Sequence, residues 1–373
     1  MTQRASEPTR IGVDVGGTFT DVVLVVDGDR HTAKVPTTAD QSVGVLDGIE
    51  KACDAAGIDP AAIDAFAHAM TVSVNALLER DGAKTALVTT QGFRDVLEIA
   101  RQDRPDLYDL DATKPDPLVP RSRRFEIDER ATTEGIEQPV DPDDVRETAR
   151  MIAATDIESV AVCLLHAYAH PENEQRVAEI LREELDVPVS ASHEVLPEFR
   201  EFERTATTVV DAYVTPAIRG YLTRLTDEAT AAGVPEPRVM QANGGTADSD
   251  TVSDHAVSTT LSGPAAGVVG AAATAADAGD ADNDAVDAAQ PSVVTFDMGG
   301  TSSDVSLVRD GVAERTTEAD IDGVPIRTPM VDITTVGAGG GSIAWVDSGG
   351  ALRVGPESAG AEPGPACYGR GGD

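Results

Sequence analysis

A fifteen-residue pattern occurs twice in this chain. Both copies combine a carboxylate, paired glycines and a hydroxyl, residue types that are suited to binding a polyphosphate. The first copy, DVGGTFTDVVLVVDG, covers residues 14–28, and the second, DMGGTSSDVSLVRDG, covers residues 297–311. Ten of the fifteen positions are identical, at a constant offset of 283 residues. Apolar segments flank the glycine pair in each copy, so we predict two β-hairpins whose turns carry Asp-x-Gly-Gly-Thr.

The turn of such a hairpin can hold phosphate. Adjacent glycines let the backbone approach a ligand closely, their N–H groups can form an anion-binding concavity, and the threonine hydroxyl adds a donor. The leading carboxylates suit Mg²⁺, directly or through water, because Mg²⁺ takes few carboxylates together with substrate phosphates. A tight turn without a ligand is the alternative. The predicted phosphate-binding residues are Gly16, Gly17, Thr18, Gly299, Gly300 and Thr301, with Asp14 and Asp297 as catalytic and metal-positioning residues.

The two hairpins resemble the phosphate-1 and phosphate-2 motifs of the actin, Hsp70 and sugar-kinase superfamily. Between them, residues 261–271 (LSGPAAGVVGA) resemble the first connecting helix of that superfamily, although a plain Gly/Ala helix with an early proline would read the same way. The resemblance implies a two-lobed α/β ATPase fold with ATP and Mg²⁺ in the cleft between the lobes. It also makes Thr20 and Ser302, beside the two turns, cofactor-binding candidates.

A closer resemblance is to the hydantoinase/oxoprolinase family, specifically to its hydantoinase A-type (N-methylhydantoinase A-like) ATP-binding subunit. The matching segments run in family order over nearly the whole chain: residues 12–21, 68–80, 92–101, 197–205, 240–245, 296–304, 336–342 and 363–369. After the equivalent of His68 the family usually has Gly-Thr-Thr, whereas this chain has Ala69-Met70-Thr71. The resemblance implies that the glycine run 336–342 lines the nucleotide cleft, so Gly339 and Gly340 are cofactor-binding candidates.

The family resemblance implies ATP-dependent opening of a cyclic amide such as 5-oxoproline or a hydantoin. ATP would phosphorylate the substrate carbonyl, and transfer of a phosphoryl group depends mainly on positioning and charge neutralisation. The chain would work in a hetero-oligomer with a hydantoinase B-type subunit. Three alternatives remain: the ATPase subunit of a ketone carboxylase of the acetone carboxylase type, a sugar kinase, and an inactive nucleotide-binding fragment. The chain lacks a recognisable catalytic aspartate loop for a sugar hydroxyl, which disfavours the kinase.

Two further residue types have both a chemical and a structural interpretation. His68 stands near the end of a predicted strand, where it could contact substrate or phosphate as a catalytic residue, or serve as a hydrogen-bonded structural histidine. Cys53, Cys163 and Cys367 stand far apart without a CxxC pair, which suits a reducing cytoplasm and excludes a disulfide framework or a thiolate zinc site. We interpret Cys367 as structural, because a nucleophilic thiol needs a neighbouring base.

The segments around these residues alternate between strand and helix patterns, which is typical of α/β layers. Apolar runs predict strands over 11–15, 20–26, 63–70, 84–89, 124–129, 159–165 and 238–241. Helical spacing predicts helices over 42–56, 72–80, 93–101, 142–154, 172–185 and 198–232. We expect a first lobe over 1–275, an acidic linker over 276–290 and the start of an incomplete second lobe over 291–373. A sheet left uncovered in that second lobe would favour association.

Charge sets limits on partners and surroundings. The 373 residues include 65 acids and 29 Lys or Arg, for a net charge of -36, and the acids are spread along the whole chain. Such a field repels phosphate backbones, so we expect neither nucleic acid nor an anionic membrane as a partner. The composition favours a halophilic, salt-adapted cytoplasm, where salt screens the self-repulsion. The sequence shows no apolar run long enough to span a membrane, and its polar first ten residues do not suggest a signal peptide.

Overall fold

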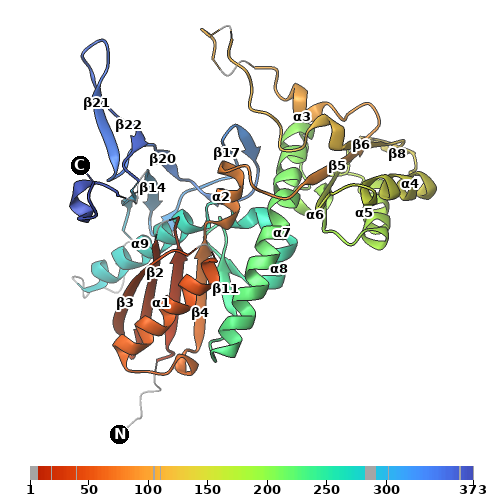
Figure 1. Cartoon of the computed structure of the whole chain (residues 1–373). Helices are drawn as coiled ribbons and strands as arrows, with labels where there is room; N and C mark the ends of the chain where they lie inside the picture. The colour runs from red at the N-terminus through yellow and green to blue at the C-terminus, as the bar shows by residue number, and fades with distance from the viewer. Residues whose placement is uncertain are drawn as a thin grey trace.

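The structure is a computed structural model that describes residues 7–17, 19–38, 40–103, 106–109, 111–281, 291–300, 302–360 and 363–372 (Figure 1). It has a mixed α/β fold built on three main sheets, in agreement with the predicted fold class. Among the described residues, no helix has the length and apolar character needed to cross a membrane.

The first sheet contains the first of the repeated hairpins. Its six strands lie in the order β12-β11-β4-β1-β2-β3. Strands β1, β2 and β3 form an antiparallel meander, β4 pairs in parallel with β1, and β11 pairs in parallel with β4. Strand β3 was not predicted, because its residues (DRHTAKVP) show little of the apolar alternation of a strand. The bounds are β1 Arg10–Val15, β2 Phe19–Val26, β3 Asp29–Pro36, β4 Ala65–Met70, β11 Pro237–Met240 and β12 Thr246–Ala247.

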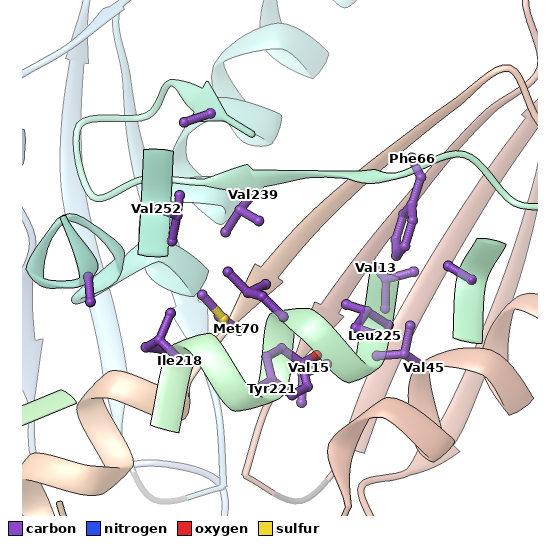
Figure 2. Packing of buried hydrophobic residues seen from close by; sticks show 14 of the residues in the cluster. Val13, Val15, Val45, Phe66, Met70, Ile218, Tyr221, Leu225, Val239 and Val252 are labelled. Atoms are coloured by element: carbon purple, nitrogen blue, oxygen red, sulfur yellow. The ribbon is translucent and has the colours of Figure 1, made fainter. Parts of the chain in front are cut away.

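One face of this sheet carries the main hydrophobic core. Alternate residues of β1, including Val13 and Val15, point toward helices α1 (Gln41–Ala56) and α7 (Glu201–Ala231) (Figure 2). There they pack with Val45 of α1 and with Tyr221 and Leu225 of α7. The opposite residues of β1, Asp14 among them, therefore face away from this core.

The second sheet forms a separate body beside the first (Figure 1). Its four parallel strands lie in the order β10-β9-β5-β6. Helices α4 and α5 cover one face, and the N-terminal half of α7 covers the other, so α7 belongs to both cores. The bounds are β5 Thr85–Thr90, β6 Arg124–Ile127, β9 Ser159–Cys163, β10 Val189–Ala191, α4 Pro142–Ala153 and α5 Glu172–Glu184. Strand β10 was not predicted, and the other five elements agree with the predicted ones to within a few residues.

The third sheet contains the second hairpin. Strand β14 pairs with β13, β20 and β15, in each case antiparallel. Four two-stranded ribbons, β7–β8, β16–β19, β17–β18 and β21–β22, complete the described strands. The third-sheet bounds are β13 Val293–Met298, β14 Ser303–Arg309, β15 Val312–Ala313 and β20 Thr334–Val336. The ribbon bounds are β7 Arg130–Thr132, β8 Gly135–Gln138, β16 Arg315–Thr316, β17 Ala319–Ile321, β18 Val324–Ile326, β19 Met330–Val331, β21 Ser342–Val346 and β22 Leu352–Ser358.

Helix α9 (Ser262–Ala281) lies between the first and third sheets (Figure 1). It contacts β4 and β11 on one side and β13, β14 and β15 on the other. The helix extends six residues into the segment predicted as an acidic linker, and residues 282–290 lie outside the described residues. The division of the chain into two lobes at this point stays a prediction.

The shorter helices include one that the sequence overestimated. The helix predicted over 93–101 is only Val96–Ile99 (α3), because Ala100 has φ 49° and ψ -134°, a conformation that ends the helix. The others are α2 Val72–Leu78, α6 Ser192–Val195 and α8 Ser249–Asp254.

Candidate functional site

The two repeated segments fold into hairpins with the same geometry. Asp14 pairs with Asp21 across β1 and β2, and Asp297 pairs with Asp304 across β13 and β14, at equivalent positions of the repeat. In the first turn the Gly16 N–H donates to the Phe19 carbonyl at 3.0 Å. In the second turn the Gly299 N–H donates to the Ser302 carbonyl at 2.9 Å. The hairpins predicted from the repeat are therefore present in both copies.

The outer glycine of each turn faces open space. A Cβ added to Gly17 would meet no heavy atom within 4 Å, and one added to Gly300 would meet only the Tyr368 hydroxyl at 3.9 Å. Among the described residues, neither glycine N–H has an acceptor. These two amides can therefore donate to a ligand. Thr18 and Thr301, the predicted hydroxyl donors, lie outside the described residues.

Helix α9 brings the two leading carboxylates to one place. An Oδ1 atom of Asp14 lies 3.3 Å from the Cβ position of Gly263, and an Oδ2 atom of Asp297 lies 3.7 Å from that of Gly267. Gly263 and Gly267 are one turn apart on α9, so both hairpins approach the first turns of the same helix. Small residues at these positions let the carboxylates come close to the helix backbone.

The electrostatics of Asp14 agree with this convergence. The residue is accessible to solvent, and its pKa is raised first by the protein packed near the carboxyl and then by the like charges of Asp21 and Asp297. The ammonium of Lys34 acts in the opposite direction. Two carboxylates that repel each other beside one helix suit a bound cation, which would relieve the repulsion.

Lys34 and the second aspartate of each hairpin were missed by the sequence analysis. Lys34, on β3, donates to both carboxylate oxygens of Asp21 at 2.7 and 2.6 Å. The equivalent Asp304 accepts instead from the Thr335 hydroxyl at 2.7 Å. The aspartates could have been found, because the eighth position of the repeat is Asp in both copies. Lys34 could not, because β3 carries little strand pattern.

Hydroxyl groups of neighbouring residues form hydrogen bonds that hold the two turns in place. Thr20, a predicted cofactor-binding residue, is fully buried, and its hydroxyl lies 3.2 Å from that of Thr37. Thr37 donates to the Gly16 carbonyl at 2.8 Å. In the second hairpin Ser303 replaces Thr20 and donates to the Ala338 carbonyl at 2.7 Å. This geometry gives Thr20 a supporting position under the turn.

The glycine run 336–342 lies against the second turn, next to Ser302. A Cβ on Gly339 would come within 2.6 Å of the Gly299 carbonyl oxygen, so only glycine fits there. The Gly340 N–H donates to that same oxygen at 2.8 Å, and the Gly339 N–H donates to the Ser342 hydroxyl at 2.8 Å. Gly339 and Gly340 are thus brought to the predicted site, with their amides already engaged in holding the turn.

His68 lies away from the hairpin turns. It is within β4, 1 % exposed, and its Nε2 lies 2.7 Å from the Tyr221 hydroxyl of α7. Burial lowers the pKa of His68 to about 4, so the ring is neutral at pH 7. This position in the core supports the structural interpretation of the histidine and gives no direct path to a ligand.

The residues at the two turns can be compared with the ligands that Mg²⁺ and a nucleotide require. Among the described residues, no three His, Cys, Asp or Glu side chains form a cluster that could hold a metal ion. Asp14 and Asp297 alone suit a hydrated Mg²⁺ that takes its remaining ligands from phosphate and water. The open amides of Gly17 and Gly300 suit the phosphates themselves.

Comparisons with known proteins agree with the repeat and the fold. Residues 10–185 match the hydantoinase/oxoprolinase N-terminal region, and residues 204–373 match the hydantoinase/oxoprolinase domain. Caprolactamase subunit alpha from Pseudomonas jessenii is 38% identical over 97% of this chain and 52% of the relative. The acetophenone carboxylase gamma subunit from Aromatoleum aromaticum is 38% identical over 97% of this chain and 51% of the relative.

A solved structure gives the same result in three dimensions. The ATP-dependent caprolactamase from Pseudomonas jessenii superposes with a TM-score of 0.85 and 36% identity, over 97% of this chain and 53% of that one. The chain therefore spans about half the length of each of these relatives. Both family matches, the relatives and the fold lead to one conclusion: this chain belongs to the hydantoinase/oxoprolinase family.

Proposed function

We propose that this chain is the Mg-ATP-binding part of an enzyme that opens cyclic amides by phosphorylating the substrate carbonyl. The observation that carries the proposal is the convergence of Asp14 and Asp297 on the first turns of α9, from two hairpins of identical register. The family membership and the caprolactamase relative support the reaction class.

Each group of residues has a separate role in the proposed site. The amides of Gly17 and Gly300 hold phosphate oxygens from opposite sides, and the N-terminal end of α9 adds a partial positive charge nearby. Asp14 and Asp297 hold the hydrated Mg²⁺, which when bound neutralises charge on the phosphates. The ammonium of Lys34 opposes the rise in the pKa of Asp14. Since phosphoryl transfer depends on alignment and charge neutralisation, these residues supply what the step needs.

In the proposed reaction the amide oxygen attacks the γ-phosphorus and ADP leaves. The carbon that bears the phosphorylated oxygen is then a better electrophile, so water adds to it and the C–N bond breaks, leaving an acyl phosphate and a protonated amine. A second water releases phosphate and leaves the ring-opened amino acid. A hydantoinase B-type partner subunit would carry the steps after phosphorylation, and the naming of relatives as subunits supports such a hetero-oligomer.

The first test is binding of Mg-ATP to this chain by calorimetry. We expect Asp14→Asn to weaken binding at least about tenfold, because the metal loses one of its two carboxylates. The control is Asp29→Asn, an exposed aspartate at the start of β3, where β2 turns into β3. Equal affinities for the three proteins would contradict the site.

The second test concerns the reaction. ADP release is measured for the chain with its partner subunit, with cyclic amides and separately with ketones plus bicarbonate. Stimulation by cyclic amides supports the proposal. Stimulation only by ketone plus bicarbonate supports instead the ketone carboxylase alternative, which the acetophenone carboxylase relative favours.

A further inference from the structure

A cavity of about 560 Å³ opens beside the second hairpin. It reaches Ser302 of the hairpin turn and Gly263 of α9, the glycine that lies against Asp14. Helix α2 forms one wall, and β17 and β19 form another. The cavity is therefore next to the proposed phosphate site and large enough for a small ring.

The walls of this cavity combine apolar surface with negative charge. Val74, Leu78, Leu261, Ile321 and Ile333 supply apolar side chains. Five carboxylates also line it: Asp304, Glu318, Asp320, Asp322 and Asp332. Within the described ranges, no Lys, Arg or His side chain is part of the lining.

Two arginines that are not part of the lining pair with these carboxylates. Arg80 binds Asp322 at 2.9 Å, and Arg327 pairs with Glu318. Uncharged donors serve two of the others, since Asp304 accepts from the Thr335 hydroxyl and Asp320 accepts from the Gly323 N–H at 2.8 Å. The lining thus keeps an excess of negative charge and has no cation to receive an anionic group.

We propose that this cavity holds the substrate ring and selects cyclic amides that carry no carboxylate, such as simple lactams and hydantoins. This inference rests on the proposed function. An uncharged ring finds apolar contacts here, and its carbonyl can face the phosphate site. A ring with a carboxylate, such as 5-oxoproline, meets an excess of like charge on walls without a cationic side chain, and like charges disfavour its binding.

A matched pair of substrates tests this directly. 2-Pyrrolidinone and 5-oxoproline share the same five-membered lactam and differ by one carboxylate, and the amide of 5-oxoproline restores the bulk without the charge. We measure substrate-stimulated ADP release by the chain with its partner subunit. The expected kcat/KM for 5-oxoproline is about 100-fold below those of pyrrolidinone and of the amide.

Charge removal in the cavity should narrow this gap. The double variant Asp320→Asn, Asp332→Asn should raise kcat/KM for 5-oxoproline about tenfold relative to that for pyrrolidinone. The control is Asp144→Asn, an exposed aspartate on α4 of the second sheet. Turnover of 5-oxoproline equal to that of pyrrolidinone would overturn the inference and leave the proposed function standing. No stimulation by any of the three compounds would overturn the proposed function, and the inference with it.

Discussion

At the scale of single residues, the charge balance at the first hairpin depends on Lys34. Its ammonium bonds both oxygens of Asp21, lies 5.2 Å from the Phe19 ring centre and lowers the pKa of Asp14 against two like charges. Lys34 is one of only four lysines in a chain with 65 acidic residues, so lysine side chains are scarce in this protein. The hairpin therefore combines a strong metal-attracting field with one counter-charge.

We predict that Lys34→Met changes the pH dependence of Mg-ATP binding. Without the ammonium the pKa of Asp14 rises further, and a protonated carboxyl does not hold Mg²⁺. The acid limb of binding, measured by calorimetry from pH 4.5 to 8, should move to higher pH. Lys84→Met is the control, because Lys84 pairs with Asp156 in the second-sheet body. An unmoved acid limb would rule out a role for Lys34 at the site.

His68 gives a second prediction, on stability. Its pKa is about 4 in the folded protein against 6.5 ordinarily, so the unfolded chain binds the proton more tightly. The contribution of neutral His68 to the free energy of unfolding is therefore complete above pH 6.5 and is lost as the pH falls toward 4. We expect His68 to account for about 2 kcal/mol of the stability lost between pH 7.5 and 5.

The measurement is urea unfolding at both pH values for the wild type, His68→Gln and His31→Gln. Gln keeps a polar group for Tyr221 but does not titrate, so His68→Gln should show the smaller pH dependence. His31 on β3 is the control, since it is not fully buried. The same pH dependence in His68→Gln and wild type would contradict the buried neutral histidine.

At the scale of elements, the second hairpin is held by the glycine run that follows it. We predict that Gly339→Ala destabilises the protein by about 1–3 kcal/mol, because its Cβ would overlap backbone atoms that cannot move aside. Mg-ATP affinity should fall as well, since the displaced turn carries Gly300. Gly337→Ala is a matched control in the same run, where an added Cβ meets nothing within 4 Å. Equal stability of both variants would be inconsistent with this packing.

The elements also show how far sequence patterns reach. The hairpins were predictable because a repeated Asp-x-Gly-Gly-Thr signals turn and chemistry together, and helices such as α4 and α5 because their apolar spacing is regular. Strand β3 was missed because its partner β2, rather than its own pattern, holds it in the sheet. The core position of His68 and the contact of Gly339 with Gly299 depend on which elements pack together, and local patterns do not carry that information.

At the scale of the whole molecule, charge and exposed apolar surface act against each other. The net charge of -36 disfavours the compact state through self-repulsion. The Debye length falls from about 10 Å at 0.1 M salt to about 3 Å at 1 M, so molar salt removes most of this repulsion. We therefore predict that the thermal midpoint, followed by circular dichroism, rises from 0.1 M to 2 M KCl. The same rise in choline chloride would identify screening, and equal stability in dilute buffer and molar KCl would refute the salt-adaptation hypothesis.

The third sheet gives the last prediction. One face of its hairpin is uncovered within the described part of the chain, with Val294 65%, Phe296 62% and Met298 57% exposed. Leu307, opposite Val294 in the pairing, adds to the same apolar face. A contiguous apolar face of this kind favours association.

We predict that the chain on its own self-associates, measured by light scattering after size-exclusion chromatography. Association should grow with KCl, because screening removes the repulsion between acidic copies while burial of apolar surface keeps its gain. The double variant Phe296→Lys, Met298→Lys should return the chain toward a monomer. Leu107→Lys, which removes a similarly exposed apolar side chain from a distant loop, should leave association unchanged. A wild-type chain that stays monomeric in molar KCl would mean that the uncovered face is too small or too mobile to drive association.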